Sequence, residues 1–221
     1  NMDGESLRAE IKKLRTLTDK PFGVNVMLMS PYVEEVSEVI ISERVPVVTT
    51  GAGNPLVYMK KWLAAGVKVI PVVASVALAQ MVAKRGATAV VAEGGESGGH
   101  IGEANTMPLV PQVADSVDIP VIAAGGIADG RGLAAALMLG AEGVQMGTRF
   151  LVAKECKIHP NYKQKVLKAG DTGTMVSGRR SGHPVRALKT AFAREYSELE
   201  KNPEITDEKL AEFGSGALRR A

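Results

Sequence analysis

The stretch that decides the fold is IPVIAAGGIADGRGLAAALMLGAEGVQMGTRF, residues Ile119–Phe150. It opens with a short apolar run that ends in Gly125-Gly126, continues through a helix-like segment at Asp129–Gly140, and reaches a second run that leads to Gly147-Thr148. Neither run alternates polar and apolar residues, which is typical of strands buried on both faces of a parallel sheet. The stretch therefore predicts a strand, a crossover helix and a parallel strand.

The same order of apolar run, turn and helix recurs along the chain at a spacing of about 20 to 30 residues, as expected for βα units. Helical apolar spacing marks the segments Ser30–Glu43 and Asn54–Gly66 as well as Asp129–Gly140. We predict strands within six apolar runs, which are Phe22–Leu28, Val45–Gly53, Val67–Ser75, Ala87–Gly94, Ile119–Gly126 and Gly143–Phe150. The fold class is therefore α/β.

The ends of the predicted strands favour a barrel over an open doubly wound sheet. Toward its end every run carries small or polar residues, such as Asn25, Thr49-Thr50-Gly51 and Gly147-Thr148. No G-x-G-x-x-G motif follows the first run. Function spread over all strand ends suits a TIM-like (β/α)8 barrel, whose site is built by all the βα loops. A barrel needs eight strands, so we expect its first two strands to be missing before Asn1. Phosphate sites of barrels use the loops after the last two strands, which makes Ile119–Phe150 strands seven and eight.

We predict two parts in the chain. Residues 1–155 form the partial barrel with its six βα units, and residues 156–221 form a helical lid or appendage, incomplete at its C-terminus. The second part is more polar and has too few apolar residues to fold alone. Its expected helices are Tyr162–Lys168, Val185–Lys201 and Asp207–Phe213.

Composition excludes several classes of function. The 221 residues carry a net charge of +3 and only 4% aromatic residues, without the aromatic and basic strip of a nucleic-acid binder. No apolar run reaches the roughly 18 to 20 residues of a membrane helix, and no signal peptide is found. Cys156 is the only cysteine, which suits a reducing cytoplasm, and it has no arrangement that would mark it as a nucleophile. No His, Cys and Asp spacing suggests a metal site.

The two glycine-bearing turns could hold a phosphate group. Backbone amides at Gly125-Gly126 and Gly147-Thr148 would form a cradle into which an anion fits closely, or the glycines could simply allow tight turns. Asn25 lies within an apolar run, where its amide could bind a flavin ring or be a satisfied core amide. Glu93 directly follows a hydrophobic strand, which is well placed for contacts with a ribityl chain or ring.

The candidate acid or base is His100, in the glycine-rich stretch AEGGESGGHIGEAN at residues 92–105. So many glycines suit a loop that approaches a ligand closely or moves, and an imidazole there can exchange a proton near neutral pH. Taken alone, a histidine is more often structural than catalytic. His159 is expected to be exposed, and His183 could belong to a lid.

Several motifs together resemble one known family. KPFGVNVMLMSP, VVTTGAGNP, AEGGESGGHIG, VIAAGGIADGRG and GVQMGTRFLVAKE are similar to the FMN-dependent enoyl-acyl-carrier-protein reductase II family, relatives of the nitronate monooxygenases. The similarity runs from about Asp19 through Arg186, with a weaker echo at Gly214–Ala221. Most of these motifs fit both activities, whereas TTGAGNP and NVMLMSP favour the reductase.

The resemblance implies a TIM-like barrel with a small helical domain, with no counterpart here for the family's first two strands and C-terminal helices. It implies that FMN is the cofactor and that His100 stands near the flavin ring over the substrate. The residues that would contact FMN are Asn25, Glu93, Gly125, Gly126, Gln145, Gly147 and Thr148.

The implied reaction is the last step of the fatty-acid elongation cycle. NADH or NADPH would supply a hydride, through FMN, to a trans-2-enoyl thioester carried by acyl carrier protein, and His100 would assist protonation. In the alternative, a nitronate monooxygenase, the same imidazole would act as a base on a nitroalkane. A third reading is a non-enzymatic protein with a generic phosphate cradle. The choice of nicotinamide cofactor, the acyl chain length and a homodimer are left open.

Overall fold

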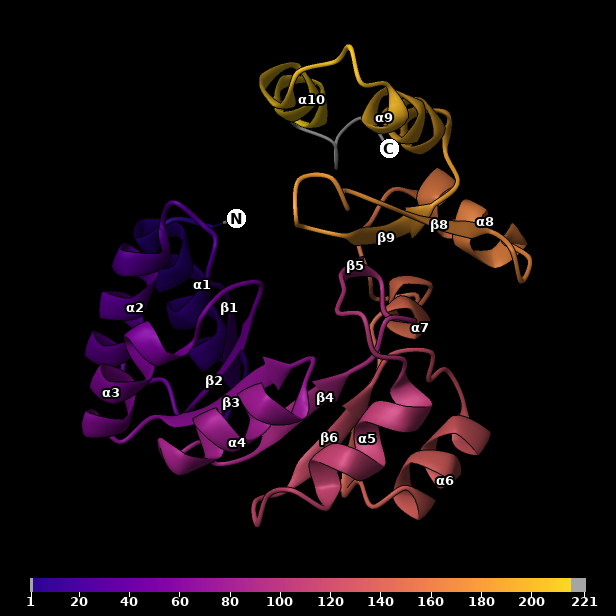
Figure 1. Cartoon of the computed structure of the whole chain (residues 1–221). Helices are drawn as coiled ribbons and strands as arrows, with labels where there is room; N and C mark the ends of the chain where they lie inside the picture. The colour runs from indigo at the N-terminus through magenta and orange to yellow at the C-terminus, as the bar shows by residue number, and fades with distance from the viewer. Residues whose placement is uncertain (1, 216–221) are drawn as a thin grey trace.

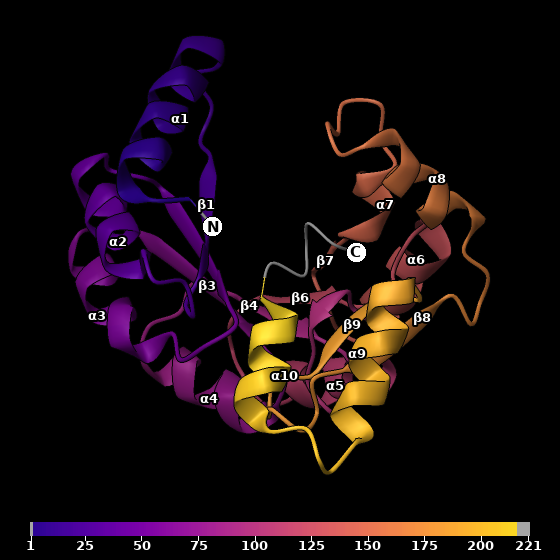
Figure 2. The same cartoon turned by 90° about the horizontal axis from the view of Figure 1, so that it is seen from above.

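The computed structural model describes residues 2–215, and a curled parallel sheet of six strands is its main feature. The sheet order β1-β2-β3-β4-β6-β7 follows the order of the chain, without the reversal that defines a doubly wound sheet. Figures 1 and 2 show the sheet bending into an arc, and β1 and β7 are not paired with each other. The strands are β1 (Gly23–Met27), β2 (Val47–Gly51), β3 (Lys68–Val73), β4 (Val90–Glu93), β6 (Val121–Ala124) and β7 (Gly143–Gln145). The predicted partial TIM-like barrel is therefore confirmed.

Helices cover the outer side of the arc (Figure 2). Local caps set where some of them begin: Asp3, Ser75 and Asp129 each accept hydrogen bonds from backbone amides of the turn that follows. A short helix, α7 (Thr148–Leu151), follows β7 directly. The helices around the arc are α1 (Gly4–Leu17), α2 (Val33–Ser42), α3 (Leu56–Ala64), α4 (Val76–Lys84), α5 (Thr106–Ala114) and α6 (Gly130–Met138).

The hydrophobic core lies between this helical layer and the sheet. Val48, Val69 and Val90, from three neighbouring strands, are fully buried against helical residues such as Ile40 and Trp62. Burying each such side chain contributes about 1.5–3 kcal/mol, which fixes the face that each strand turns toward the helices. Strand residues on the opposite face of the sheet do not belong to this core.

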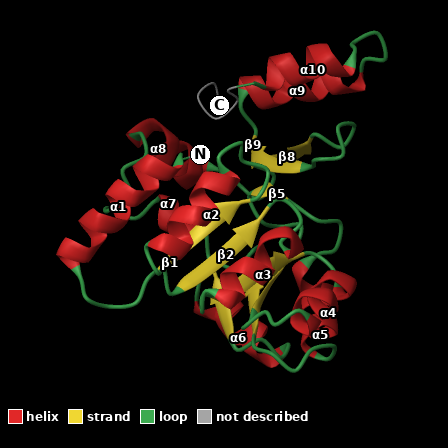
Figure 3. Ribbon diagram, turned by 90° about the vertical axis from the view of Figure 1, so that its left-hand side faces the viewer, coloured by secondary structure: helices red, strands yellow, loops and turns green. Residues whose placement is uncertain are grey.

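A second, smaller layer lies beyond the carboxyl ends of the strands (Figure 3). It is an antiparallel sheet in the order β5-β9-β8, where β5 is Gly99–His100, β8 is Thr174–Ser177 and β9 is Val185–Leu188. Its helices are α8 (Pro160–Lys168), α9 (Ala191–Lys201) and α10 (Asp207–Gly214). Phe192 of α9 and Phe213 of α10 stack with their ring centroids 5.2 Å apart.

The structure corrects two element boundaries. The predicted helix Val185–Lys201 is wrong in its first part, because residues 185–188 are the central strand of the small sheet and α9 begins only at Ala191. The run Gly143–Phe150 is a strand only as far as Gln145, and α7 takes up its end.

The small sheet also joins the two predicted parts of the chain. Its strand β5 comes from residues 1–155, whereas β8 and β9 come from residues 156–221. The division into two domains stays a prediction. Within residues 2–215, no helix has the length and apolar character needed to cross a membrane.

Candidate functional site

Three of the predicted site residues, together with Thr49, lie on one side of the curled sheet. Asn25 pairs in register with Thr49, whose hydroxyl donates a hydrogen bond of 2.9 Å to the Asn25 side-chain oxygen. Residues paired in register point to the same side, and side chains alternate along a strand. Following the register from β2 to β7 places Asn25, Thr49, Glu93 and Gln145 on one side, opposite the core valines. Because the helices pack on the other side, these polar groups line the inner face.

Asn25 is not a core amide, since the residue is exposed and its only described side-chain hydrogen bond is the one to Thr49. That bond occupies the Asn25 carbonyl oxygen, while the amide nitrogen has no partner among residues 2–215. An amide held in this way presents two N–H donors toward the inner face.

Glu93 ends β4 and is half-buried. Burial raises the pKa of Glu93, and the neighbouring Ser97 hydroxyl partly opposes that shift. No basic side chain lies within ion-pair distance of Glu93 in the described part of the chain. A half-buried carboxyl group without a basic partner favours hydrogen bonds with neutral hydroxyl or amide groups and disfavours contact with an anion.

Two glycines of the site are explained by close packing within the protein. Gly125 has φ +101°, and a Cβ there would stand 2.7 Å from Thr106 Oγ1. A Cβ on Gly94 would stand 2.1 Å from the same oxygen. Both glycines therefore let the start of α5 approach the ends of β4 and β6. At Gly125 the tight-turn interpretation accounts for the residue without a ligand.

The glycine-rich loop after β4 is anchored by Glu96 and Thr106, neither of which the sequence singled out. The Glu96 carboxylate accepts hydrogen bonds from the Thr106 backbone N–H at 2.9 Å and from the Thr106 hydroxyl at 2.8 Å. A carboxylate at the first N–H groups of a helix is a stabilising arrangement. The pair is ten residues apart, so no helical spacing could have revealed it.

Gly147 and Thr148 fit a ligand cradle better than Gly125 does. A Cβ on Gly147 would meet nothing within 4 Å, so the space around this glycine is open. Gln145 and Thr148 are exposed, and their side chains have no hydrogen bond to any other residue among 2–215. Thr148 Oγ1 lies 3.8 Å from where a Cβ on Gly98 would stand, which brings the start of α7 against the loop after β4.

Gly126 lies under the same loop. It has φ +71°, and a Cβ there would stand 3.2 Å from the Glu96 Cβ. The turns after β6 and β7 thus both meet the loop that carries His100. The structure brings together the two predicted cradle turns and this loop.

His100 belongs to a strand and not to a free loop. It pairs with Val185 across β5 and β9, and the Ile101 N–H donates to the Pro184 carbonyl at 3.0 Å. The imidazole is exposed. Among residues 2–215, no hydrogen bond joins the His100 side chain to Glu93 or Gln145. Figure 1 shows β5 between the end of β4 and β9.

Arg186, which was not predicted as a site residue, links the glycine-rich loop to the small sheet. Its Nε donates to the Gly95 carbonyl at 2.9 Å, and its Nη1 donates to Thr174 Oγ1 at 3.1 Å. One side chain thereby ties the glycine-rich loop to both β8 and β9. Gly95 and Arg186 are 91 residues apart, so only the folded chain shows the contact.

The other candidates are not part of this group. His159 is exposed, as expected, and caps α8 by accepting a hydrogen bond from the Asn161 N–H at 3.2 Å. His183 is exposed in the turn between β8 and β9. Cys156 is a free, half-buried cysteine. In the part of the chain that the structure describes, no group of three or more His, Cys, Asp or Glu side chains could hold a metal ion.

The inner face suits a flat, polar cofactor with a phosphate tail. Free side-chain groups of Asn25 and Gln145 lie on it, and the open space at Gly147 with the free Thr148 hydroxyl could take a terminal phosphate. FMN has this form, and a flavin would be oriented by such groups. The arrangement is thus chemically compatible with the predicted FMN contacts, which stay a prediction.

Comparison with known proteins gives a consistent family. Residues 30–212 match the family described as nitronate monooxygenase. A (3aS,4S,5R,7aS)-5-hydroxy-7a-methyl-1-oxo-octahydro-1H-indene-4-carboxyl-CoA dehydrogenase of Rhodococcus jostii is 46% identical over 184 residues. That match covers 83% of this chain and 52% of the relative, so the chain spans about half of that relative's length.

Two further matches cover nearly the whole chain. A probable nitronate monooxygenase of Staphylococcus saprophyticus is 33% identical over 263 residues, which cover 98% of this chain and 74% of the relative. The structure of FabK from Thermotoga maritima superposes with a TM-score of 0.94 at 56% identity, covering 100% of this chain and 70% of FabK.

Proposed function

The chain belongs to the nitronate monooxygenase family, and from that premise we propose that it forms the core of a flavin-dependent enoyl-acyl-carrier-protein reductase. The proposed enzyme reduces trans-2-enoyl thioesters to acyl thioesters with NADH or NADPH, and the carrier of the acyl group is acyl carrier protein. FMN, when bound, would supply the hydride chemistry.

The similarity to FabK is the observation that carries this proposal. At 56% identity over the entire chain it exceeds the 33% of the staphylococcal nitronate monooxygenase and the 27% of a nitroalkane oxidase from Streptomyces ansochromogenes. FabK is an enoyl-acyl-carrier-protein reductase II, the activity that TTGAGNP and NVMLMSP favour. The match to a carboxyl-CoA dehydrogenase at 46% identity also supports a substrate joined to a carrier through a carboxyl group.

In the proposed site, the chain's own groups bind and orient. Asn25 and Gln145 hold the ring system on the inner face, and Gly147 with Thr148 receives the phosphate. Glu93, whose pKa is raised by burial, accepts hydrogen bonds from the cofactor's hydroxyl-bearing chain. His100, held on β5, would donate a proton to the α-carbon of the enolate that hydride addition at the β-carbon of the enoyl thioester leaves.

The proposal is tested with purified, FMN-loaded protein carrying this chain. Oxidation of NADH is followed with crotonyl thioester in the absence of oxygen, and oxygen consumption is followed separately with a nitronate. The reductase predicts enoyl-dependent NADH oxidation that continues without oxygen. Turnover of nitronate with oxygen, combined with no reduction of the enoyl thioester, would reject it.

A nitronate monooxygenase is the second candidate. It is supported by the staphylococcal relatives, whose match covers 98% of this chain, and by the family description itself. In that enzyme, His100 would remove a proton from a nitroalkane. The same two assays separate the candidates, since only this one needs oxygen and a nitro compound.

A further inference from the structure

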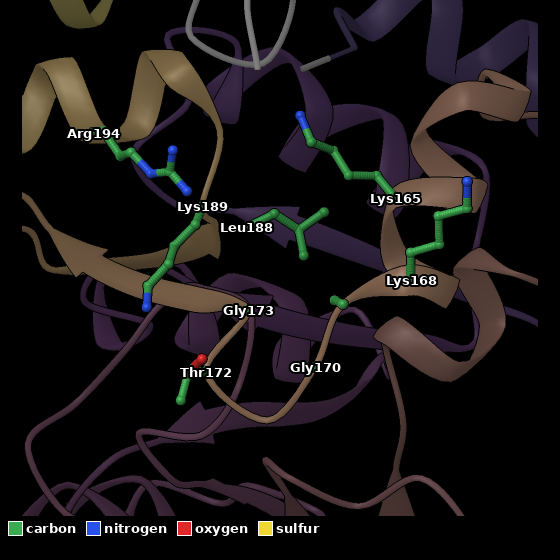
Figure 4. A pocket seen from close by; sticks show the side chains of 9 residues that line it. Lys165, Lys168, Gly170, Thr172, Gly173, Leu188, Lys189 and Arg194 are labelled. Atoms are coloured by element: carbon green, nitrogen blue, oxygen red, sulfur yellow. The ribbon is translucent and has the colours of Figure 1, made fainter.

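A hollow of about 440 Å³ lies in the second, smaller layer, away from the inner face of the main sheet. It is bordered by the C-terminal turn of α8, the loop after it, the end of β9 and the first turn of α9. Figure 4 shows Lys165 and Arg194 extending toward the hollow from α8 and α9, with Leu188 between them. Gly170 and Thr172 border it from the connecting loop.

The hollow is strongly basic. Lys165, Lys168, Lys189 and Arg194 line it, and none of the described lining residues is a carboxylate. All four cations are exposed, and none forms an ion pair with another residue of 2–215.

Helix stability accounts for only part of this charge. Lys165 and Lys168 lie in the last turn of α8, where a cation favours the negative end of the helix dipole. Lys189 follows β9, and Arg194 lies in the first turn of α9, where a cation is unfavourable. Four like charges around one concavity repel one another unless an anion enters it.

The hollow is connected to the candidate site through β9. Val185 at one end of this strand pairs with His100, and Leu188 at the other end borders the hollow. Three residues of strand span about 10 Å. A ligand that reaches His100 at one end could therefore place its charged part at the other.

We infer that this basic hollow binds the phosphate groups of an organic co-substrate, and the inference rests in part on the proposed function. A concave site lined by two glycines, a threonine and four cations suits a compact phosphate better than the broad surface of an acidic protein. Two sources share this chemistry. One is a coenzyme A thioester, and the other is the ribose phosphate of NADPH.

Direct binding measurements test the inference without any turnover. FMN-loaded protein is titrated in a calorimeter with coenzyme A, with 2′,5′-ADP as the phosphate-bearing part of NADPH, and with pantetheine as a phosphate-free control. The test variant is Lys165→Ala/Arg194→Ala. The matched control is Lys12→Ala/Lys13→Ala, which removes two exposed cations from α1.

We expect the parent protein and the α1 control to bind one of the phosphorylated probes equally well and the test variant to bind it about 10- to 100-fold more weakly. Preference for coenzyme A assigns the thioester as the source, and preference for 2′,5′-ADP assigns the dinucleotide. The binding of pantetheine should not differ between the parent protein and either variant. Lys165→Arg/Arg194→Lys, which keeps both charges, should restore most of the affinity.

The inference is overturned if the parent binds neither phosphorylated probe, or if the α1 control weakens binding as much as the test variant. Unfolding temperatures of all variants are compared first, and the charge-keeping variant excludes a loss of folding as the cause. Because no step uses catalysis, a protein without enoyl reductase activity can still show this site, and an active reductase can lack it.

Discussion

At the scale of single residues, His100 carries the sharpest prediction. His100→Ala should keep bound FMN, because the imidazole lies on β5 and not among the inner-face groups, but should lose much of the reductase step. Assistance by proton transfer is worth about 10²- to 10⁴-fold in rate. The measurement is single-turnover reduction of crotonyl thioester together with the flavin spectrum. His183→Ala, in an exposed turn, is the control, and a His100 variant with unchanged turnover would return the residue to a structural role.

Glu93 predicts a pH dependence of stability. Burial raises the pKa of Glu93 in the folded protein above the ordinary value of a glutamate. The folded state then binds this proton more tightly than the unfolded state, so the contribution is most favourable below the unfolded pKa. It is lost as the pH rises through the interval up to the folded pKa.

Glu93→Gln removes this titration. Its free energy of unfolding, measured by urea denaturation without flavin, should therefore decrease less between pH 4 and pH 7 (roughly the range that spans the ordinary glutamate pKa) than that of the parent. Glu142→Gln, which removes an exposed carboxylate beside β7, serves as the matched control. Parallel curves for the parent and Glu93→Gln would contradict the prediction.

The glycine at 125 and the glycine at 147 should respond in opposite ways to alanine. Gly125→Ala places a Cβ at a φ of +101° and 2.7 Å from Thr106 Oγ1, and should destabilise the protein by about 1–3 kcal/mol. Gly147→Ala meets no atom within 4 Å and should change stability little, yet should weaken FMN binding if the open space holds the phosphate. Thermal denaturation and flavin titration separate the two effects. Equal FMN affinity in Gly147→Ala would remove this glycine from the cradle.

At the scale of elements, Arg186 should determine how firmly β5 is held. Arg186→Ala removes the hydrogen bonds to Gly95 and Thr174, and a bond from a charged donor is worth about 1.5–3 kcal/mol. Amide exchange at Ile101, which donates to Pro184, should accelerate by about 10-fold or more. Exchange in α3, remote in the core layer, is the internal reference. Unchanged protection at Ile101 would show that backbone pairing alone holds β5.

The elements also show what the sequence could and could not predict. Each strand and helix of the arc follows from local signals, because the apolar runs and the caps such as Asp129 act within a few residues. The small sheet has no such signal: β5 is two residues long, and Val185–Leu188 reads as the start of a helix. Its strands are defined by partners far along the chain, as in the contact of Arg186 with Gly95.

The same distinction applies to the candidate site. Strand-end residues such as Asn25 and Gln145 could be predicted, because the carboxyl ends of parallel strands meet at one edge. The role of Gly125 could not, since its close neighbour Thr106 is reached only through the fold. Glu96 was missed for a related reason, because its carboxylate caps a helix that begins ten residues later.

At the scale of the whole molecule, the two layers should differ in stability. The main core is made of residues of the arc, whereas α9 and α10 contribute only a few buried side chains, such as Ala193 and Leu210. The only tryptophan, Trp62, is fully buried in the arc. Segments with few buried apolar contacts open at lower free energy. Urea should therefore reduce the helical circular dichroism signal before it changes tryptophan fluorescence.

Limited proteolysis provides an independent measurement of the same difference, and its first cuts should fall after residue 155. Coincident transitions for the two spectroscopic probes would instead indicate one cooperative unit. Residues of α4, which pack against the arc, should remain protected in the first proteolytic products.

Because β5 pairs with β9, the residues of the candidate site are held by stretches of chain that lie far apart in the sequence. The proposed cofactor contacts come from strand ends of the arc, while His100 is held by a hairpin whose residues come almost 90 positions later. Substitutions in that hairpin can change how His100 is held without altering the strand-end residues themselves. A family built in this way can diversify its chemistry through one short hairpin while it inherits the rest unchanged.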